Sequence, residues 1–269
     1  MAVPDAPASS GYLRNINVLV TRPEGHADNL VRLLEAEGAH AIRFPTIEIR
    51  EPRDQAGVLQ IIDRINEFDI AVFVSRNAVI HAMRFIQPRC ALPAHLLLAC
   101  VGRGSAEELK NLGYTPTVVP QEKFDSEALL ALPPLQNVRD KKIVIFRGET
   151  GRELLANTLR TRGAQVEYAE CYRRVKPHAE AEPLLQRWAR GEVHIVTLTS
   201  VDALRNLFDL LGEAGRKWLI HTPAVVISQR AASVCRELGF KTAVLIAEQA
   251  SDEAIVECIK AWRKAQISL

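Results

Sequence analysis

The residues best suited to bind a ligand lie at six places where a predicted strand passes into a predicted helix. These junctions are 21–25, 75–77, 102–105, 147–151, 199–202 and 228–230. Serine and threonine hydroxyls recur at them, and five carry an arginine, the exception being 199–202. Free backbone N–H groups at a helix start attract anions, and arginine pairs well with carboxylates and phosphates. The junctions therefore predict a ligand with several negative charges.

The same junctions argue against a nucleotide. None contains GxxxxGK[ST], and the Gly-Arg-Gly at 102–104 lacks the third glycine of GxGxxG. Several helix starts without a phosphate loop suit a ligand that carries many carboxylates. For each single hydroxyl a simpler interpretation stays open, namely that it only caps a helix. A serine or threonine at the N-cap stabilises its helix by about 1 kcal/mol whatever the function of the protein.

Tyr172 is the best candidate for acid–base chemistry. It stands in a predicted extended segment beside Arg173 and Arg174, and a phenol can donate a proton or a hydrogen bond. The alternative is an aromatic side chain packed for stability. Ser75 and Ser200 lack the GxSxG pattern of a hydrolase nucleophile.

Composition narrows the function classes. The 269 residues are 48% hydrophobic and 25% charged with a net charge of +2, which gives no support to nucleic-acid binding. Five scattered cysteines without CxxC and seven dispersed histidines predict reduced thiols and no metal site. Residues 1–15 are expected to form a flexible leader rather than a signal peptide, and no apolar run has the ~20 residues of a membrane span. A cytoplasmic protein is expected.

The elements that position these residues alternate along the chain. Strands are predicted at 16–20, 70–74, 96–101, 142–146, 194–198, 224–227 and 243–246, and helices at 26–37, 54–66, 78–86, 152–162 and, before the C-terminus, 251–264, with others after 102–105, 125, 199–202 and 228–230. Such alternation predicts parallel sheets with helices on both faces, which bind ligands beyond the carboxyl ends of the strands.

A fixed offset indicates a tandem duplication. Arg22 and Arg147 each follow a predicted strand and lie 125 positions apart, and Ser75 and Ser200 have the same spacing. Gly38 and Gly163, which end the next helices, are again 125 apart, and Gly113 and Gly239 are 126 apart. One offset held across these landmarks predicts two copies of a β/α array.

In their order and spacing these landmarks resemble the uroporphyrinogen-III synthase family from about residue 16 to residue 260. The similar stretches are VTRP at 20–23, FVSRNAV at 73–79, VG at 101–102, RGETGRELL at 147–155, RGA at 162–164, YRRV at 172–175 and TS at 199–200. The resemblance implies an α/β fold of two similar lobes, each a parallel, flavodoxin- or Rossmann-like sheet flanked by helices. It places lobe one at 1–46 plus 178–269, lobe two at 55–165, and a two-stranded connector at 47–54 and 166–177.

The resemblance also implies a reaction. A family member is a hydro-lyase of heme biosynthesis that closes linear hydroxymethylbilane with loss of water and inversion of ring D through a spiro intermediate. It needs no cofactor and no metal. For this chain a monomer that binds neither nucleic acid nor membrane is expected. The family's substrate carries eight carboxylates, which suits the junctions.

The expected site follows from the matching positions. Tyr172 is predicted to be catalytic and to assist departure of the hydroxyl group. The residues predicted to bind the substrate are Thr21, Arg22, Ser75, Asn77, Gly102, Ser105, Arg147, Gly148, Arg152, Thr199, Ser200, Ser228 and Gln229.

Two other functions stay open on the sequence. A non-catalytic bilobed protein could bind a polycarboxylate ligand by closing around it. An α/β enzyme acting on phosphosugars is disfavoured by the missing phosphate loop.

Overall fold

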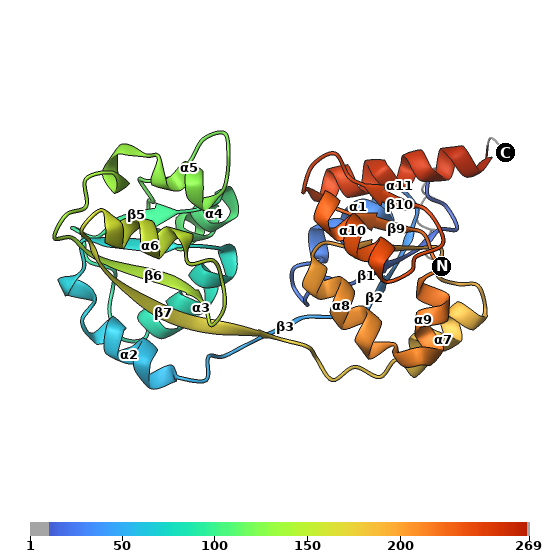
Figure 1. Cartoon of the computed structure of the whole chain (residues 1–269), viewed down its shortest axis with the longest axis horizontal. Helices are drawn as coiled ribbons and strands as arrows, with labels where there is room; N and C mark the ends of the chain where they lie inside the picture. The colour runs from blue at the N-terminus through green and yellow to red at the C-terminus, as the bar shows by residue number, and fades with distance from the viewer. Residues whose placement is uncertain (1–10, 268–269) are drawn as a thin grey trace, which may run out of the picture. The chain divides into compact units, whose positions relative to one another are not determined.

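The computed structural model describes residues 11–267, so most of the expected leader at 1–15 lies outside the described part. Its contacts divide the chain into two compact units (Figure 1). The first unit comprises Met1–Glu48 and Val175–Leu269, and the second comprises Ile49–Arg174. Each unit contains one five-stranded sheet, as the predicted fold class required.

The sheet of the first unit has the strand order β10-β9-β8-β1-β2, and every pairing in it is parallel. Its strands are β1 (Asn17–Val20), β2 (His40–Arg43), β8 (Ile195–Leu198), β9 (Ala224–Val226) and β10 (Val244–Ile246). Its helices are α1 (Asp28–Ala36), α7 (Glu182–Ala189), α8 (Val201–Leu210), α9 (Gly212–Leu219), α10 (Gln229–Glu237) and α11 (Asp252–Ile267).

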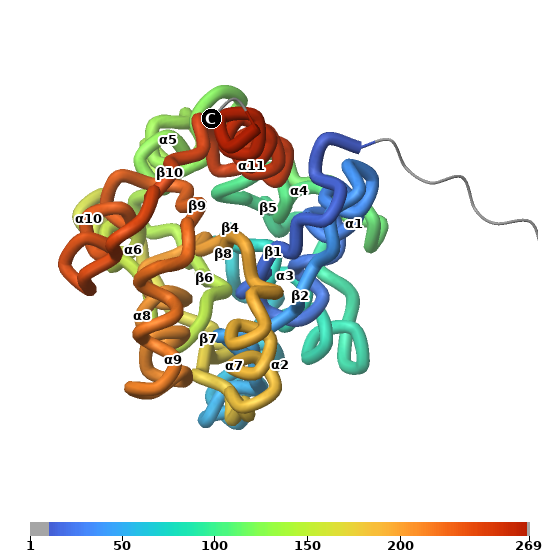
Figure 2. The backbone as a smooth tube through the Cα atoms, turned by 90° about the vertical axis from the view of Figure 1, so that its right-hand side faces the viewer, coloured from blue at the N-terminus to red at the C-terminus, as the bar shows by residue number. Residues whose placement is uncertain are grey.

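Alternate residues of these strands face two separate cores. Leu19, Val196 and Leu198 pack with α7 to α10, whereas Val18 and Ile195 pack with α1 and α11. Figure 2 shows this arrangement, with α8 and α10 to one side of β1, β8 and β9 and α1 to the other. The apolar runs of these strands are thus explained by burial on both faces.

The sheet of the second unit has the strand order β3-β7-β6-β4-β5. Its strands are β3 (Glu48–Arg50), β4 (Ile70–Phe73), β5 (Leu97–Cys100), β6 (Lys142–Gly148) and β7 (Gln165–Val175). The helices are α2 (Gln55–Asp63), α3 (Arg76–Ile86), α4 (Arg103–Asn111), α5 (Ser126–Leu130) and α6 (Leu154–Thr161), with short 3₁₀ turns η1 (Ile65–Glu67) and η2 (Pro133–Leu135).

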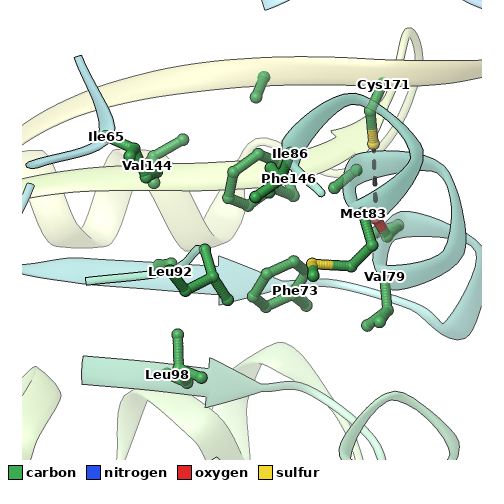
Figure 3. Close-up of a cluster of buried hydrophobic side chains, with 14 of the residues drawn as sticks. Ile65, Phe73, Val79, Met83, Ile86, Leu92, Leu98, Val144, Phe146 and Cys171 are labelled. Atoms are coloured by element: carbon green, nitrogen blue, oxygen red, sulfur yellow. Dashed lines mark hydrogen bonds between the residues drawn. The ribbon is translucent and has the colours of Figure 1, made fainter. Parts of the chain in front are cut away.

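The core under α2, α3 and α4 is built on two aromatic rings of adjacent strands. Phe73 and Phe146 stack with their centroids 4.9 Å apart and an interplanar angle of 12°. Figure 3 shows them beside Met83 and Ile86 of α3. Helices α5 and α6 bury the opposite face of the sheet. The helices after β4 and β5 therefore cover one face of this sheet, and the helix after β6 covers the other.

The duplication predicted from the sequence is confirmed in the strand registers. Val18 pairs with Ile195 in the first unit, and Ile143 pairs with Ile70 in the second. Adding 125 to Val18 and to Ile70 gives Ile143 and Ile195, so equivalent residues form equivalent pairs. Within its described residues, the second unit has no full strand equivalent to β10. At that place Val118 forms a single bridge with Ala99 of β5.

Two parts of the structure differ from expectation. Helices α7 and α9 were not predicted. At the 125-residue offset α7 corresponds to α2, whereas α9 has no helical counterpart in the described range. Segment 166–177, expected to be a connector strand, is for much of its length a sheet strand, since Gln165–Tyr172 of β7 pair with β6. Tyr172 is therefore part of the second unit.

Candidate functional site

The candidate site lies where the second sheet changes direction of winding. Strands β4 and β6 are neighbours, yet α3 after β4 and α6 after β6 cover opposite faces. Such a reversal leaves a crevice beyond the carboxyl ends of the two strands. A cavity of about 350 Å³ occupies this position. Its lining includes Ser75, Ser126, Arg147, Gly148, Thr150, Arg152, Tyr168, Tyr172 and Arg174.

Tyr172 and Ser75 meet in the wall of this cavity. Tyr172 is only 3% exposed, and its hydroxyl lies 3.2 Å from Ser75 Oγ. Ser75 is the N-cap of α3, and its Oγ accepts a hydrogen bond from the N–H of Ala78 at 3.1 Å. Since that oxygen already accepts, its own proton can be directed at Tyr172, which leaves the phenol proton for a ligand.

A bulge and a glycine bring Tyr172 to this place. Arg147 pairs with Glu170 but Gly148 pairs with Tyr172, so the register shifts across Cys171. A Cβ on Gly148 would lie 2.9 Å from Cε2 of Tyr172. Gly148 therefore contributes to the site through the space it leaves for the ring.

Arg147 is held by groups of its own unit. Its Nη1 donates to Glu153 Oε1 at 2.8 Å, its Nε donates to the Gly148 carbonyl at 3.2 Å, and its guanidinium lies 4.4 Å from the ring centre of Tyr168. The Tyr168 hydroxyl donates to the other oxygen of Glu153 at 2.6 Å. Arg147 is only 5% exposed, so its charge is already partnered.

Two pKa shifts are consistent with this cluster. The hydrogen bond from Tyr168, followed by that from Arg147, lowers the pKa of Glu153. Burial, followed by the hydrogen bond to Glu153, raises the pKa of Tyr168. The carboxylate and the phenol are thus both kept in the forms that bind each other.

Other predicted residues of the second unit lie at neighbouring helix starts. Arg152 is exposed at the mouth of the cavity, whereas Asn77 is buried in the first turn of α3. Gly102 is the N-cap of α4 with no side chain to cap it, and a Cβ there would meet nothing within 4 Å. Ser105 is buried in the first turn of the same helix.

In the first unit the predicted residues lie at the equivalent junctions. Ser200 and Ser228 are the N-caps of α8 and α10, and their hydroxyls accept from Ala203 N and Ala231 N at 3.0 and 3.2 Å. Thr199 precedes Ser200 and is partly buried, and Gln229 is exposed in the first turn of α10. The simpler N-cap interpretation holds for Ser75, Ser200 and Ser228. The hydroxyl protons of Ser200 and Ser228 can still be donated to a ligand.

Two residues of this unit are engaged internally. Thr21 is fully buried, and its hydroxyl donates to the carbonyl of Thr197 at 2.8 Å, so it fastens β1 to β8 rather than facing a ligand. Arg22 forms an ion pair with Asp252 at the start of α11. The direct substrate contacts predicted for Thr21 therefore need correction, because a buried and satisfied hydroxyl has no free surface.

Ser126, Tyr168 and Arg174 line the cavity and were not selected from the sequence. Ser126 begins α5, which is far along the chain from Tyr172, and no pattern links the two. Arg174 stands two residues after Tyr172 in β7, so both lie on one face of the strand. That alternation was the available signal, because the segment 166–177 was already predicted to be extended.

Within residues 11–267 the structure brings together no three His, Cys, Asp or Glu side chains that could hold a metal ion. The five cysteines are free thiols. No helix in the described range has the length and apolar character needed to cross a membrane.

Comparison with known proteins gives a consistent result. Residues 28–257 match the family model described as uroporphyrinogen-III synthase HemD. The chain is 33% identical to the uroporphyrinogen-III synthase of Escherichia coli K12, over 91% of this chain and 100% of that protein. It is 32% identical to the Salmonella typhimurium enzyme of the same name, over 91% and 100% of the two chains.

Solved structures agree on the fold. The crystal structure of a mutant uroporphyrinogen III synthase from the extremely thermophilic bacterium Thermus thermophilus matches with a TM-score of 0.60 at 20% identity, covering 94% of this chain and 100% of that one. The Helicobacter pylori uroporphyrinogen-III synthetase structure matches with a TM-score of 0.59 at 14% identity, over 92% and 99%.

Proposed function

This chain belongs to the uroporphyrinogen-III synthase family, and from that premise we propose that it closes hydroxymethylbilane to uroporphyrinogen III. The observation that carries the proposal is the 33% identity to the Escherichia coli enzyme along that protein's whole length. The cavity at the β4–β6 junction supports it, because it combines a buried phenol with arginines and hydroxyls.

The proposed reaction begins with loss of the hydroxyl group next to ring A as water. The resulting azafulvene cation attacks the substituted carbon of ring D and forms a spiro intermediate. Ring D is then released, inverted, and the macrocycle closes. Because the substrate also closes unaided without inversion, the protein's contribution is to hold one folded geometry and to stabilise charge as it develops.

We assign the proton for the departing hydroxyl to Tyr172. Its burial and its 3.2 Å contact with Ser75 Oγ fix the phenol oxygen at the wall of the cavity. A general acid at this point is expected to contribute roughly 10²–10⁴-fold to the rate.

The substrate's acetates and propionates are proposed to bind at the helix starts. In the second unit this role falls to Arg152 and to the helix-start N–H groups that follow Ser75 and Gly102. In the first unit Thr199, Ser200, Ser228 and Gln229 offer the equivalent groups at α8 and α10. Arg147, which Glu153 already neutralises, is proposed to shape the cavity wall.

We further propose that the protein acts in the cytoplasm as a monomer, without metal, cofactor or nucleic acid. Five free cysteines accord with a reducing compartment. The net charge of +2 gives no electrostatic reason for binding nucleic acid.

The test is to supply hydroxymethylbilane, generated in place, and to separate the porphyrin isomers after oxidation. The proposal predicts type III with the protein and type I without it. Type I alone under both conditions would exclude the synthase activity and favour the non-catalytic binding protein, which would then be sought by equilibrium binding of uroporphyrin.

A further inference from the structure

Three arginines line the cavity at the β4–β6 junction, and they differ in how their charges are used. Arg147 is 5% exposed and is bound by Glu153, the Gly148 carbonyl and the Tyr168 ring. Arg152 and Arg174 are exposed, and neither forms an ion pair within the described residues. A substrate carboxylate could therefore bind the guanidinium of Arg152 or Arg174 without displacing a protein partner.

The position of Arg174 follows from the alternation of β7. Tyr172, Arg173 and Arg174 are consecutive in the strand, so the first and third share a face and the second points the other way. Arg173 accordingly lies outside the cavity lining and donates its Nε to the carbonyl of Glu51 at 3.1 Å. Tyr172 and Arg174 both line the cavity, so a group bound by Arg174 is near the reactive phenol.

The charges around the cavity favour the same ligand. Among the described residues, its lining contains three arginines and no carboxylate. A neighbouring cavity of about 610 Å³ shares Tyr168 with it but is lined by the carboxylates of Asp54, Glu149 and Glu170 and by Arg53. An anion is therefore attracted to one side of Tyr168 and repelled from the other.

We propose that Arg174 binds a carboxylate of the substrate beside Tyr172, acting together with Arg152, whereas Arg147 positions the wall. The inference rests on the proposed function and adds a residue that selects the polycarboxylate ligand. The bound carboxylate is the same before and after ring closure, so Arg174 contributes uniform binding, and its loss raises KM with little change in kcat.

The experiment compares Arg174→Gln with Arg173→Gln, a matched change on the opposite face of the same strand. Arg174→Gln is expected to raise KM roughly fivefold, the upper range for an exposed charge pair, with kcat and the type III fraction unchanged. Arg174→Lys should recover part of the loss, because it keeps the charge but not the fork of donors. Arg173→Gln should retain the wild-type KM.

A second readout does not depend on turnover. Binding of uroporphyrin III, followed by fluorescence, should weaken by a similar factor in Arg174→Gln, and its salt dependence should become shallower. Unchanged KM and affinity in Arg174→Gln, or equal effects of the two arginine changes, would overturn the assignment. If the wild type makes type III and Arg174→Gln has the same KM and affinity as the wild type, only this inference fails. If the wild type makes no type III, the proposed function fails first.

Discussion

Gly148 and Tyr172 are paired across β6 and β7 so closely that a Cβ on the glycine would lie 2.9 Å from the tyrosine ring. Real Cβ atoms do not approach ring carbons to this distance without movement of one partner. The ring of Tyr172 also contacts His81 of α3, with the two ring centres 5.5 Å apart. The Ser75–Tyr172 contact therefore depends on the missing side chain at Gly148.

Gly148→Ala is expected to lower kcat by about tenfold or more, because the ring must shift and the phenol loses its position. Stability should fall by about 1–3 kcal/mol, as for other overpacked core sites. Steady-state kinetics and urea denaturation measure the two effects. The control is Gly104→Ala, where a Cβ meets nothing within 4 Å; kcat should not change there, and α4 should gain up to ~1 kcal/mol. Wild-type kcat in Gly148→Ala would show that the ring position is not critical.

Removing the phenol oxygen alone should separate catalysis from packing. Tyr172→Phe keeps the ring in its core and loses only the contact with Ser75, so kcat is expected to fall about tenfold or more. The loss of stability should stay within about 0.5–1.5 kcal/mol, the value of one hydrogen bond. An unchanged rate with a loss of stability would make Tyr172 a packing residue.

Ser75→Ala should affect both the helix and the reaction. Loss of the N-cap costs about 1 kcal/mol, and loss of the partner at 3.2 Å should lower kcat by disorienting the phenol. Ser251 supplies a matched control, because its Oγ accepts from Ala254 N at 3.2 Å at the start of α11, in the other unit. Ser251→Ala is expected to lose similar stability with wild-type kcat. Equal kinetic effects of the two changes would mean that only capping matters.

Glu153 should stabilise the protein in a pH-dependent way. Its pKa is lowered in the folded state, chiefly by the Tyr168 hydroxyl, so its contribution is present above its unfolded pKa of about 4.3 and is lost as pH falls through the folded value. Glu153→Gln is therefore expected to be less stable than the wild type at pH 7, with a difference that shrinks below about pH 4.3. Urea midpoints at a neutral, a mildly acidic and a strongly acidic pH measure this.

Glu170→Gln is the opposite control. Burial raises the pKa of Glu170, so folding disfavours its ionised form relative to the unfolded chain, and its removal should not destabilise the fold. A pH-independent loss of stability in Glu153→Gln, or the same pH profile in both variants, would contradict the cluster described around Arg147.

The cysteines should differ in reactivity. Burial raises the pKa of Cys100 and of Cys171 to about 12 and that of Cys235 to about 11, so at pH 8 roughly one in ten thousand of the first two is a thiolate. Native iodoacetamide labelling followed by peptide mass spectrometry should find Cys90, which is partly exposed, modified first. Early labelling of Cys171 would show that the core beneath Tyr172 opens.

The sequence was sufficient for those features that are local or periodic. Apolar runs such as Ile143–Phe146 predicted strands, and the 125-residue offset predicted the repeat that the registers contain. Helix α9 was missed because Gly212 and Gly215 weaken any helical pattern. Helix α7 was missed although Pro183 in its first turn is compatible with a helix start. Tertiary packing overrides such propensities.

The site could be predicted only as a set of helix starts. Ser75 and Tyr172 were each selected, but their contact depends on the bulge at Cys171, which leaves no mark in the pattern of residues. The pairing of Arg147 with Glu153 was equally hidden, since six residues separate them across an irregular turn. The residue types showed which hydroxyl, phenol and guanidinium groups are present, whereas the fold determines which of these groups remain free for a ligand.

The isomer composition of the product tests the central claim most directly. Hydroxymethylbilane should be followed at matched conversion with the wild-type protein and with no protein, and the oxidised porphyrins separated. Closure by this site predicts type III in large excess, with type I confined to the uncatalysed fraction. Identical type I profiles in the two reactions would contradict it.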